Sequence, residues 1–95
     1  MTAEAQVLSF LLFVRGNGAR SLDAIRAVRK ACAAAVAAPS LQVIDVFTEP
    51  KMAAKYRVIA TPTLLTVGGS SERRLVGSMS EENVREQLKG KVVGN

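Results

Sequence analysis

Histidine is absent from this chain of 95 residues, and cysteine occurs only once. This composition argues against a zinc or copper site, because such sites take their ligands mainly from histidine and cysteine. It also removes the Ser-His and Cys-His pairs that activate a nucleophile. Neither a G-x-x-x-x-G-K-[ST] loop nor a G-x-G-x-x-G run occurs. We therefore expect neither enzymatic activity nor a bound cofactor.

Signals for export and for membrane insertion are also missing. One cysteine cannot form an internal disulfide, and the first residues, MTAEAQ, lack the basic start of a signal peptide. No apolar run reaches the roughly 18 residues that a membrane-spanning helix needs. A cytoplasmic location without membrane contact is therefore expected.

Aromatic residues make up only 4% of the chain, although 48% of it is hydrophobic. A chain of this length and hydrophobicity predicts one domain over 1–95, with 1–6 and 91–95 frayed. Lys and Arg number 13 against 8 Asp and Glu, and the resulting net charge of +5 favours acidic partners. Nucleic-acid surfaces usually interleave aromatic with basic side chains, and this sequence does not, so we expect a protein partner.

The hydrophobic pattern predicts alternating strands and helices in the order β-α-β-α-β-β-α. The continuous apolar run at 7–15 is typical of a strand covered on both faces. The following elements are a helix at 21–37, a strand at 41–47, a short helix to about 56, strands at 63–67 and 73–76, and a helix after residue 80. Two crossovers imply parallel neighbours, and the Gly-Gly-Ser-Ser link at 68–71 predicts an antiparallel hairpin. The expected fold is an α/β sandwich with a mixed four-stranded sheet.

Capping residues and inward positions follow from the same pattern. We expect Ser21 to cap the first long helix, Thr48 or Glu49 to cap the short one, and Ser80 to cap the last. The first helix should bury an apolar stripe at spacings of three and four, formed by Leu22, Ile25, Val28, Cys32 and Val36. The last helix should bury Val84 and Leu88. Cys32 is thus expected as a core residue, since buried free cysteine is common and inert.

Five fragments carry a family resemblance. They are LLFVRGN at 11–17, LQVIDVFTEP at 41–50, IATPTL at 59–64, RRLVG at 73–77 and the serine at 80. In this order and spacing they closely resemble the KaiB family of circadian clock proteins and the similar sensor domain of the histidine kinase SasA. The resemblance covers residues 7 to about 90. It includes the X-Pro-Thr segment of thioredoxins, but the Cys-x-x-Cys pair of thioredoxins is missing.

The resemblance implies docking rather than chemistry. KaiB-like proteins bind the ring of a KaiC-type ATPase, and the assembly then sequesters KaiA and displaces SasA. The resemblance thus implies a KaiC-type ATPase as partner, with KaiA or a SasA-like kinase as further partners. Homologues outside the clock are associated with stress responses, which leaves a stress-response interaction module as an alternative. A thioredoxin-like oxidoreductase is a further alternative that the missing cysteine pair disfavours.

The family is also known for changing fold, with a tetrameric resting form whose C-terminal half is rearranged. This chain has Gly77-Ser78-Met79-Ser80 where clock members commonly have Gly-Asp-Leu-Ser, and Gly68 to Ser71 replaces their proline-rich connection. Each local signal from 62 to 90 agrees with the thioredoxin-like arrangement. We therefore expect that state to dominate, as a monomer, with the resting tetramer as the alternative.

The resemblance and the charge pattern together give a set of candidate partner-binding residues: Arg26, Arg29, Lys30, Ser40, Gln42, Arg73 and Arg74. The first three form a basic stripe, which a plain solvated helix face would also explain. Adjacent residues of a strand point to opposite faces, so at most one of the two neighbouring arginines should face a given partner, and both could instead protect an edge strand.

Four further residues are expected to act structurally. Pro62 is expected as a cis proline by its match to the thioredoxin loop, Gly77 ends the fourth strand and Ser80 caps the last helix. Asp45, inside an apolar strand, is expected to make a structural contact at the end of the sheet.

Overall fold

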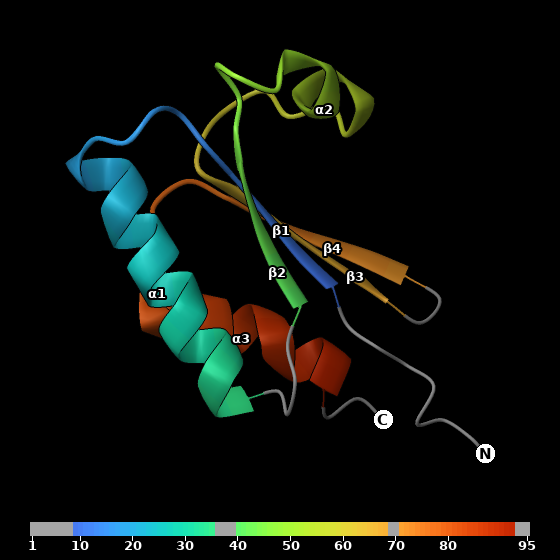
Figure 1. Cartoon of the computed structure of the whole chain (residues 1–95). Coiled ribbons are helices and arrows are strands. Elements are labelled where there is room, and N and C mark those ends of the chain that lie inside the picture. The colour runs from blue at the N-terminus through green and yellow to red at the C-terminus, as the bar shows by residue number, and fades with distance from the viewer. Residues whose placement is uncertain (1–8, 36–39, 69–70, 93–95) are drawn as a thin grey trace.

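The computed structural model describes residues 9–35, 40–68 and 71–92. Its elements are β1 (Ser9–Val14), α1 (Ala19–Ala35), β2 (Ser40–Asp45), α2 (Pro50–Lys55), β3 (Thr63–Gly68), β4 (Ser71–Val76) and α3 (Glu81–Val92). The four strands form one sheet in the order β2-β1-β3-β4. α1 and α3 lie together on one face, and α2 lies at the far end of the sheet (Figure 1). The predicted element order and mixed sheet are confirmed. Of the two predicted parallel crossovers, only the one through α1 is present. The one through α2 is wrong, because β3 lies beyond β1 and runs antiparallel to it.

The central strand β1 explains the long apolar run of the sequence. It pairs in parallel with β2 and antiparallel with β3, so it has no free edge. Its side chains alternate between the two faces: Phe10 and Leu12 point into the core under α1 and α3, whereas Phe13 points to the α2 side. All three are fully buried. A strand covered on both faces needs apolar residues at every position, as the sequence predicts.

The two faces of the sheet carry separate hydrophobic clusters. On the larger side, α1 and α3 contribute Ala24, Val28, Ala31, Cys32 and Val84. On the smaller side, Met52 of α2 and Tyr56, which directly follows α2, pack against the cluster that contains Phe13, and the rings of Phe13 and Tyr56 have centroids 5.9 Å apart. The predicted inward positions Val36 and Leu88 lie outside the residues whose side chains are described.

The predicted start of α1 is wrong. The helix begins at Ala19, and Ser21 lies within its first turn, where the hydroxyl donates a hydrogen bond of 3.0 Å to the Arg15 carbonyl. Leu22 is 45% exposed rather than inward. The predicted inward positions Val28 and Cys32 are confirmed, and the buried stripe also includes Ala24 and Ala31, whose small side chains allow α1 to lie close to the sheet. The predicted stripe contains the larger apolar residues and omits these alanines.

Other element ends also differ from the prediction. β2 ends at Asp45 rather than residue 47, and β4 begins at Ser71 rather than residue 73. Glu49 precedes α2 without a side-chain capping bond, and the Thr48 hydroxyl donates to the Asp45 carbonyl at 3.3 Å instead. The Ser80 cap is confirmed, because its hydroxyl accepts the Asn83 N–H at 3.0 Å.

Within the described ranges, none of the helices has the length and apolar character to cross a membrane.

The last helix continues to Val92, beyond the expected end near residue 90.

A matched pair of leucine substitutions tests the assignment of the core. We expect Leu12→Ala to lower the free energy of unfolding by about 2–5 kcal/mol, because it leaves a cavity in a fully buried site. Leu22→Ala should change it by less than about 0.5 kcal/mol, since Leu22 is largely exposed. Urea denaturation followed by circular dichroism measures both, and equal losses would contradict the observed face of α1.

Candidate protein-docking site

Three loops meet at the end of the sheet where β1 and β2 finish. The Asp45 carboxylate joins two of them, because one of its oxygens accepts the Gly16 N–H at 3.1 Å and the Phe47 N–H at 2.9 Å. The loop after β1 is thereby tied to the loop after β2. The expected contact of Asp45 at the sheet end is confirmed.

Phe47 and Arg15 form one wall of this loop region. Gly16 has a φ of +71°, and a Cβ built there would lie 3.7 Å from the Phe47 ring. Glycine thus supplies a left-handed turn beneath the aromatic ring. The Arg15 guanidinium stands 5.3 Å from the centroid of the same ring, which is a cation–π contact. Phe47 remains 63% exposed even so.

The third loop contains the peptide bond between Thr61 and Pro62, which is cis, as the sequence predicts. The Pro62 carbonyl accepts the Gly77 N–H at 2.9 Å, and the Thr63 hydroxyl donates to the Ala60 carbonyl. Gly77 has a φ of +103°, a conformation that favours glycine. The predicted structural residues Pro62 and Gly77 therefore meet in one hydrogen bond.

The basic stripe of α1 faces solvent. Arg26, Arg29 and Lys30 are all exposed, and Arg26 forms an exposed ion pair of 3.3 Å with Asp23. Such a pair contributes little to stability, about 0–1 kcal/mol. The stripe therefore remains available to a partner.

Ser40 and Gln42 are exposed at the start of the edge strand β2. Leu41, which lies between them, and Val43, which follows Gln42, pack into the cluster under α1. Because neighbouring residues alternate, Ser40 and Gln42 point to the opposite face of the sheet. They thus share an edge with the α1 stripe but not a face.

Arg73 and Arg74 point to opposite faces of β4, as expected. The guanidinium of Arg73 donates to the Gln87 carbonyl of α3 at 3.3 Å. Arg74 donates to the carbonyls of Tyr56 and Arg57 at 2.7 and 3.1 Å, and so satisfies the C-terminal end of α2. The two side chains thus link β4 to α3 and to the end of α2. β4 is the edge strand on the opposite side of the sheet from β2. The seven candidate residues therefore form three separate groups rather than one patch.

The loop between β1 and α1, where a thioredoxin carries its cysteine pair, reads Gly16-Asn17-Gly18 and contains no thiol. Cys32 lies in α1, is only 1% exposed, and burial raises the pKa of its thiol to about 11. Such a thiol is a poor nucleophile at neutral pH. In the described part of the chain, no group of three or more Cys, Asp or Glu side chains could hold a metal ion.

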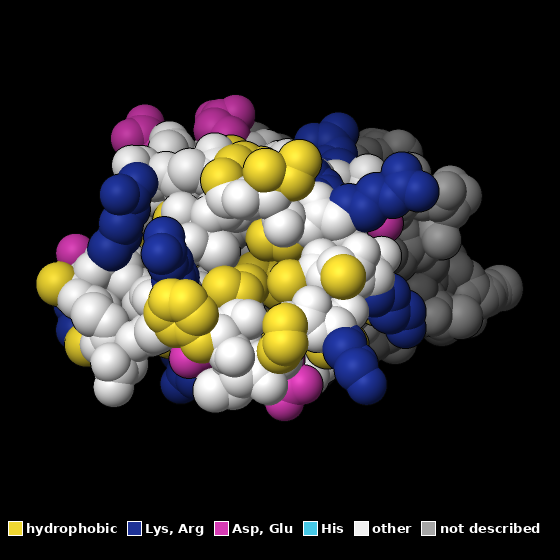
Figure 2. Space-filling model, turned by 90° about the horizontal axis from the view of Figure 1, so that it is seen from above, with side chains coloured by type: hydrophobic (Ala, Val, Ile, Leu, Met, Phe, Trp, Pro, Cys, Tyr) yellow, Lys and Arg dark blue, Asp and Glu magenta, His cyan; other side chains and the backbone are white. Residues whose placement is uncertain are grey.

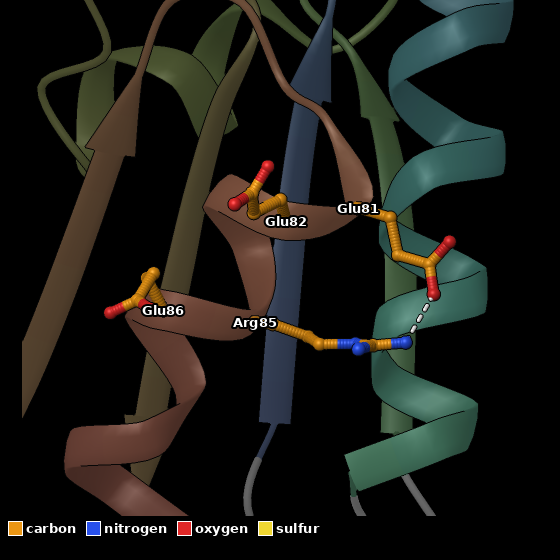
Figure 3. Close-up of a pocket in the computed structure, with 4 residues that line it drawn as sticks. All are labelled: Glu81, Glu82, Arg85 and Glu86. Carbon is orange, nitrogen blue, oxygen red and sulfur yellow. Dashed lines mark hydrogen bonds and ion pairs between the residues drawn. The ribbon is translucent and has the colours of Figure 1, made fainter.

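A hollow of about 490 Å³ lies beside the first turns of α3 and is lined by Glu81, Glu82, Arg85 and Glu86. Glu81 and Arg85 extend toward α1 and form an ion pair of 2.6 Å, whereas Glu82 and Glu86 point away (Figure 3). Carboxylates in a first helical turn complement the helix dipole. This explains Glu81 and Glu82 without a ligand.

The fold and the loop region define a thioredoxin-like domain that lacks the redox cysteine pair. A likeness to chloroplastic thioredoxin z shows the fold alone, with a TM-score of 0.77 at 17% identity over 98% of this chain and 84% of that one. The N-terminal domain of Synechococcus elongatus SasA is similar at a TM-score of 0.81 and 32% identity, covering all of this chain and 91% of that chain.

The family model described as the KaiB domain matches residues 11–90. The circadian clock oscillator protein KaiB of Synechococcus sp. strain RCC307 is 32% identical over 71 residues, which are 74% of this chain and 64% of that relative's length. This chain belongs to the KaiB family. The matched stretch spans somewhat less than two thirds of that relative.

Two residues of the loop region are absent from the predicted site residues. The sequence pattern places Phe47 in a strand and Ile59 in a family motif, yet they are 63% and 96% exposed. Both residues follow the end of a strand or helix and lie near glycine or proline turns. This position in the sequence is the signal that could have indicated exposed loop residues with a functional role.

Removing the Asp45 carboxylate should loosen the joined loops. We expect Asp45→Ala to lower the free energy of unfolding by about 1.5–3 kcal/mol, because two backbone donors lose a charged acceptor. The control is Asp23→Ala, whose carboxylate is 72% exposed and should matter by less than about 0.5 kcal/mol. Guanidinium denaturation measures both, and a neutral Asp45→Ala would show that the bridge is dispensable.

The raised pKa of Cys32 predicts slow thiol chemistry. At about pH 8 the folded chain should react with a disulfide reagent far more slowly than the unfolded chain, because burial disfavours the thiolate. A matched control carries Cys32→Ala together with Ala33→Cys, which moves the thiol to the adjacent exposed position of α1. Equal absorbance traces for the two folded proteins would argue against the buried thiol.

Proposed function

We propose that this chain is a non-enzymatic clock adaptor that docks on the ring of a KaiC-type ATPase. The observation that carries the proposal is the match of the KaiB domain model over residues 11–90. The likeness to the SasA N-terminal domain supports it, because that domain has the same thioredoxin-like arrangement at 32% identity. KaiA and a SasA-like kinase are further candidate partners of the same assembly.

The arrangement of the C-terminal half supports a docking-competent state. β3 and β4 form a hairpin, and α3 follows the Ser80 cap. This is the thioredoxin-like form that the family uses for binding, rather than its rearranged resting form. A competent state that dominates avoids the loss of apparent affinity that a minor competent state imposes. We propose that the isolated chain holds this form as a monomer.

The α1 stripe and the start of β2 are the preferred docking residues. Arg26, Arg29 and Lys30 are exposed, and Ser40 and Gln42 lie along the neighbouring edge strand. Arg73 and Arg74 rank lower, because their guanidiniums already donate to backbone carbonyls of the chain itself. An exposed basic helix face is suited to an acidic protein surface, where charge steers association.

Charge reversal on α1 tests this docking surface. The double variant Arg29→Glu, Lys30→Glu should weaken binding to the KaiC-type ATPase of the same organism by about tenfold or more, since like charges then face each other. The matched control is Lys51→Glu in α2, which is also exposed but lies on another element and should change the affinity by less than about twofold. Biolayer interferometry at two salt concentrations measures both.

Two results would count against the proposal. An affinity unchanged by the double variant would remove α1 from the interface. The absence of any binding by the unmodified chain, with a correctly folded ATPase ring, would remove the clock function itself.

A further inference from the structure

Two adjoining hollows lie at the loop end of the sheet, away from the exposed face of α1. The larger, of about 460 Å³, is lined by Arg15, Phe47, Ala53 and the segment 58–61, with Val46 at its side. The smaller, of about 190 Å³, is lined in part by Arg20 and Pro62 and shares Arg15 and Thr61 with the larger. Figure 2 views this end directly and shows hydrophobic side chains around a depression, with Lys and Arg at its margins.

The mouth of the larger hollow is apolar and exposed. Ile59 is 96% exposed and Phe47 63%, the highest values among the large hydrophobic side chains that the structure describes as exposed. Neither belongs to the clusters that hold the sheet, whereas Val46 and Val58 behind them do. The fold gains nothing from Ile59 in this position. Large apolar side chains exposed around a concave surface are typical of a binding site.

The walls of the hollow are fixed before any partner arrives. Asp45 holds the backbone beside Phe47 by its bond to the Phe47 N–H. On the other side, the Val58 N–H donates to the Ala53 carbonyl at 2.9 Å, which anchors the start of the segment 58–61. A preformed hollow saves a ligand the cost of ordering its site.

The segment between these anchors leaves backbone donors unused. In the ranges 9–35, 40–68 and 71–92, the N–H groups of Ile59, Ala60 and Thr61 make no hydrogen bond to another described residue. Donors in an exposed, non-helical segment can pair with the carbonyls of an extended chain. A peptide is therefore a better fit to this hollow than a compact small molecule.

The charge of the hollow selects among peptides. Arg15 lines both hollows and Arg20 lines the smaller one, and none of the described lining residues of either hollow is acidic. Guanidinium groups bind carboxylates in a forked geometry. A second copy of this chain is disfavoured as the occupant, because each copy carries a net charge of +5.

We propose that the two adjoining hollows together bind an extended acidic segment of a partner protein, with one apolar side chain seated between Phe47 and Ile59 in the larger hollow. The carboxylates beside that side chain lie against Arg15 and Arg20. The proposal concerns the loop end of the sheet and does not depend on docking through α1. It gives the chain a second binding surface.

A random short-peptide display library, selected on the intact chain, tests the proposal. We expect enrichment of sequences with an apolar residue next to aspartate or glutamate. A fluorescein-labelled copy of an enriched peptide should then bind about tenfold more weakly to Ile59→Ser and to Arg20→Glu, as fluorescence anisotropy measures. Both substituted positions are exposed, so the variants should fold.

Matched controls separate the hollow from general effects. Val76→Ser removes another exposed apolar side chain, and Lys51→Glu makes another charge reversal, and neither residue lines the two hollows. Both should bind the peptide within about twofold of the unmodified chain.

Three results would overturn the proposal. One is that the library yields no stronger enrichment of peptides on the unmodified chain than on the Ile59→Ser variant. Another is enrichment of basic or purely apolar peptides. The third is a sedimenting dimer that Ile59→Ser converts to monomer, which would make a second copy the occupant. Binding to the ATPase is measured separately from binding to the peptide. A negative peptide result therefore leaves the proposed α1 docking surface standing, and a negative ATPase result leaves the proposed peptide site standing.

Discussion

The burial of β1 on both faces is the constraint on which the rest of the structure depends. β1 pairs with a neighbour on each side, and its alternating side chains supply both hydrophobic clusters. α1 and α3 cover one cluster, and the short α2 covers part of the other. Because every position of β1 is used, the sheet order and the placement of the three helices follow from one apolar segment.

The Asp45 carboxylate extends this order from the sheet into the loops. It stands one residue past Ile44, a buried member of the smaller cluster, and holds donors from two loops. In a thioredoxin the same end of the sheet presents a reactive cysteine pair. Here the loops present Phe47, Arg15 and Ile59 on a fixed frame. The exposed side chains at this end of the sheet are therefore apolar and basic.

The basic residues of the chain serve two different purposes. Arg73 and Arg74 donate to carbonyls of α3 and α2, and so act as internal fasteners of the β4 edge. Arg29 and Lys30 on α1 are exposed and can meet an acidic surface, and Arg15 and Arg20 are exposed at the loop end. Fewer basic side chains are therefore accessible to a partner than the net charge suggests, because some of them already bind carbonyls of the chain itself.

The sequence alone determined the element order, the buried central strand, the Ser80 cap, the cis proline and the family, because these depend on local pattern and ordered motifs. It did not determine the start of α1 or the exposure of Leu22, since the small Ala24 and Ala31 complete the buried face of α1 in place of Leu22. Nor could it show that Arg74 caps α2, or that Phe47 and Ile59 flank one hollow. Those contacts join segments distant in sequence, and only the packing of the sheet and its loops brings them together.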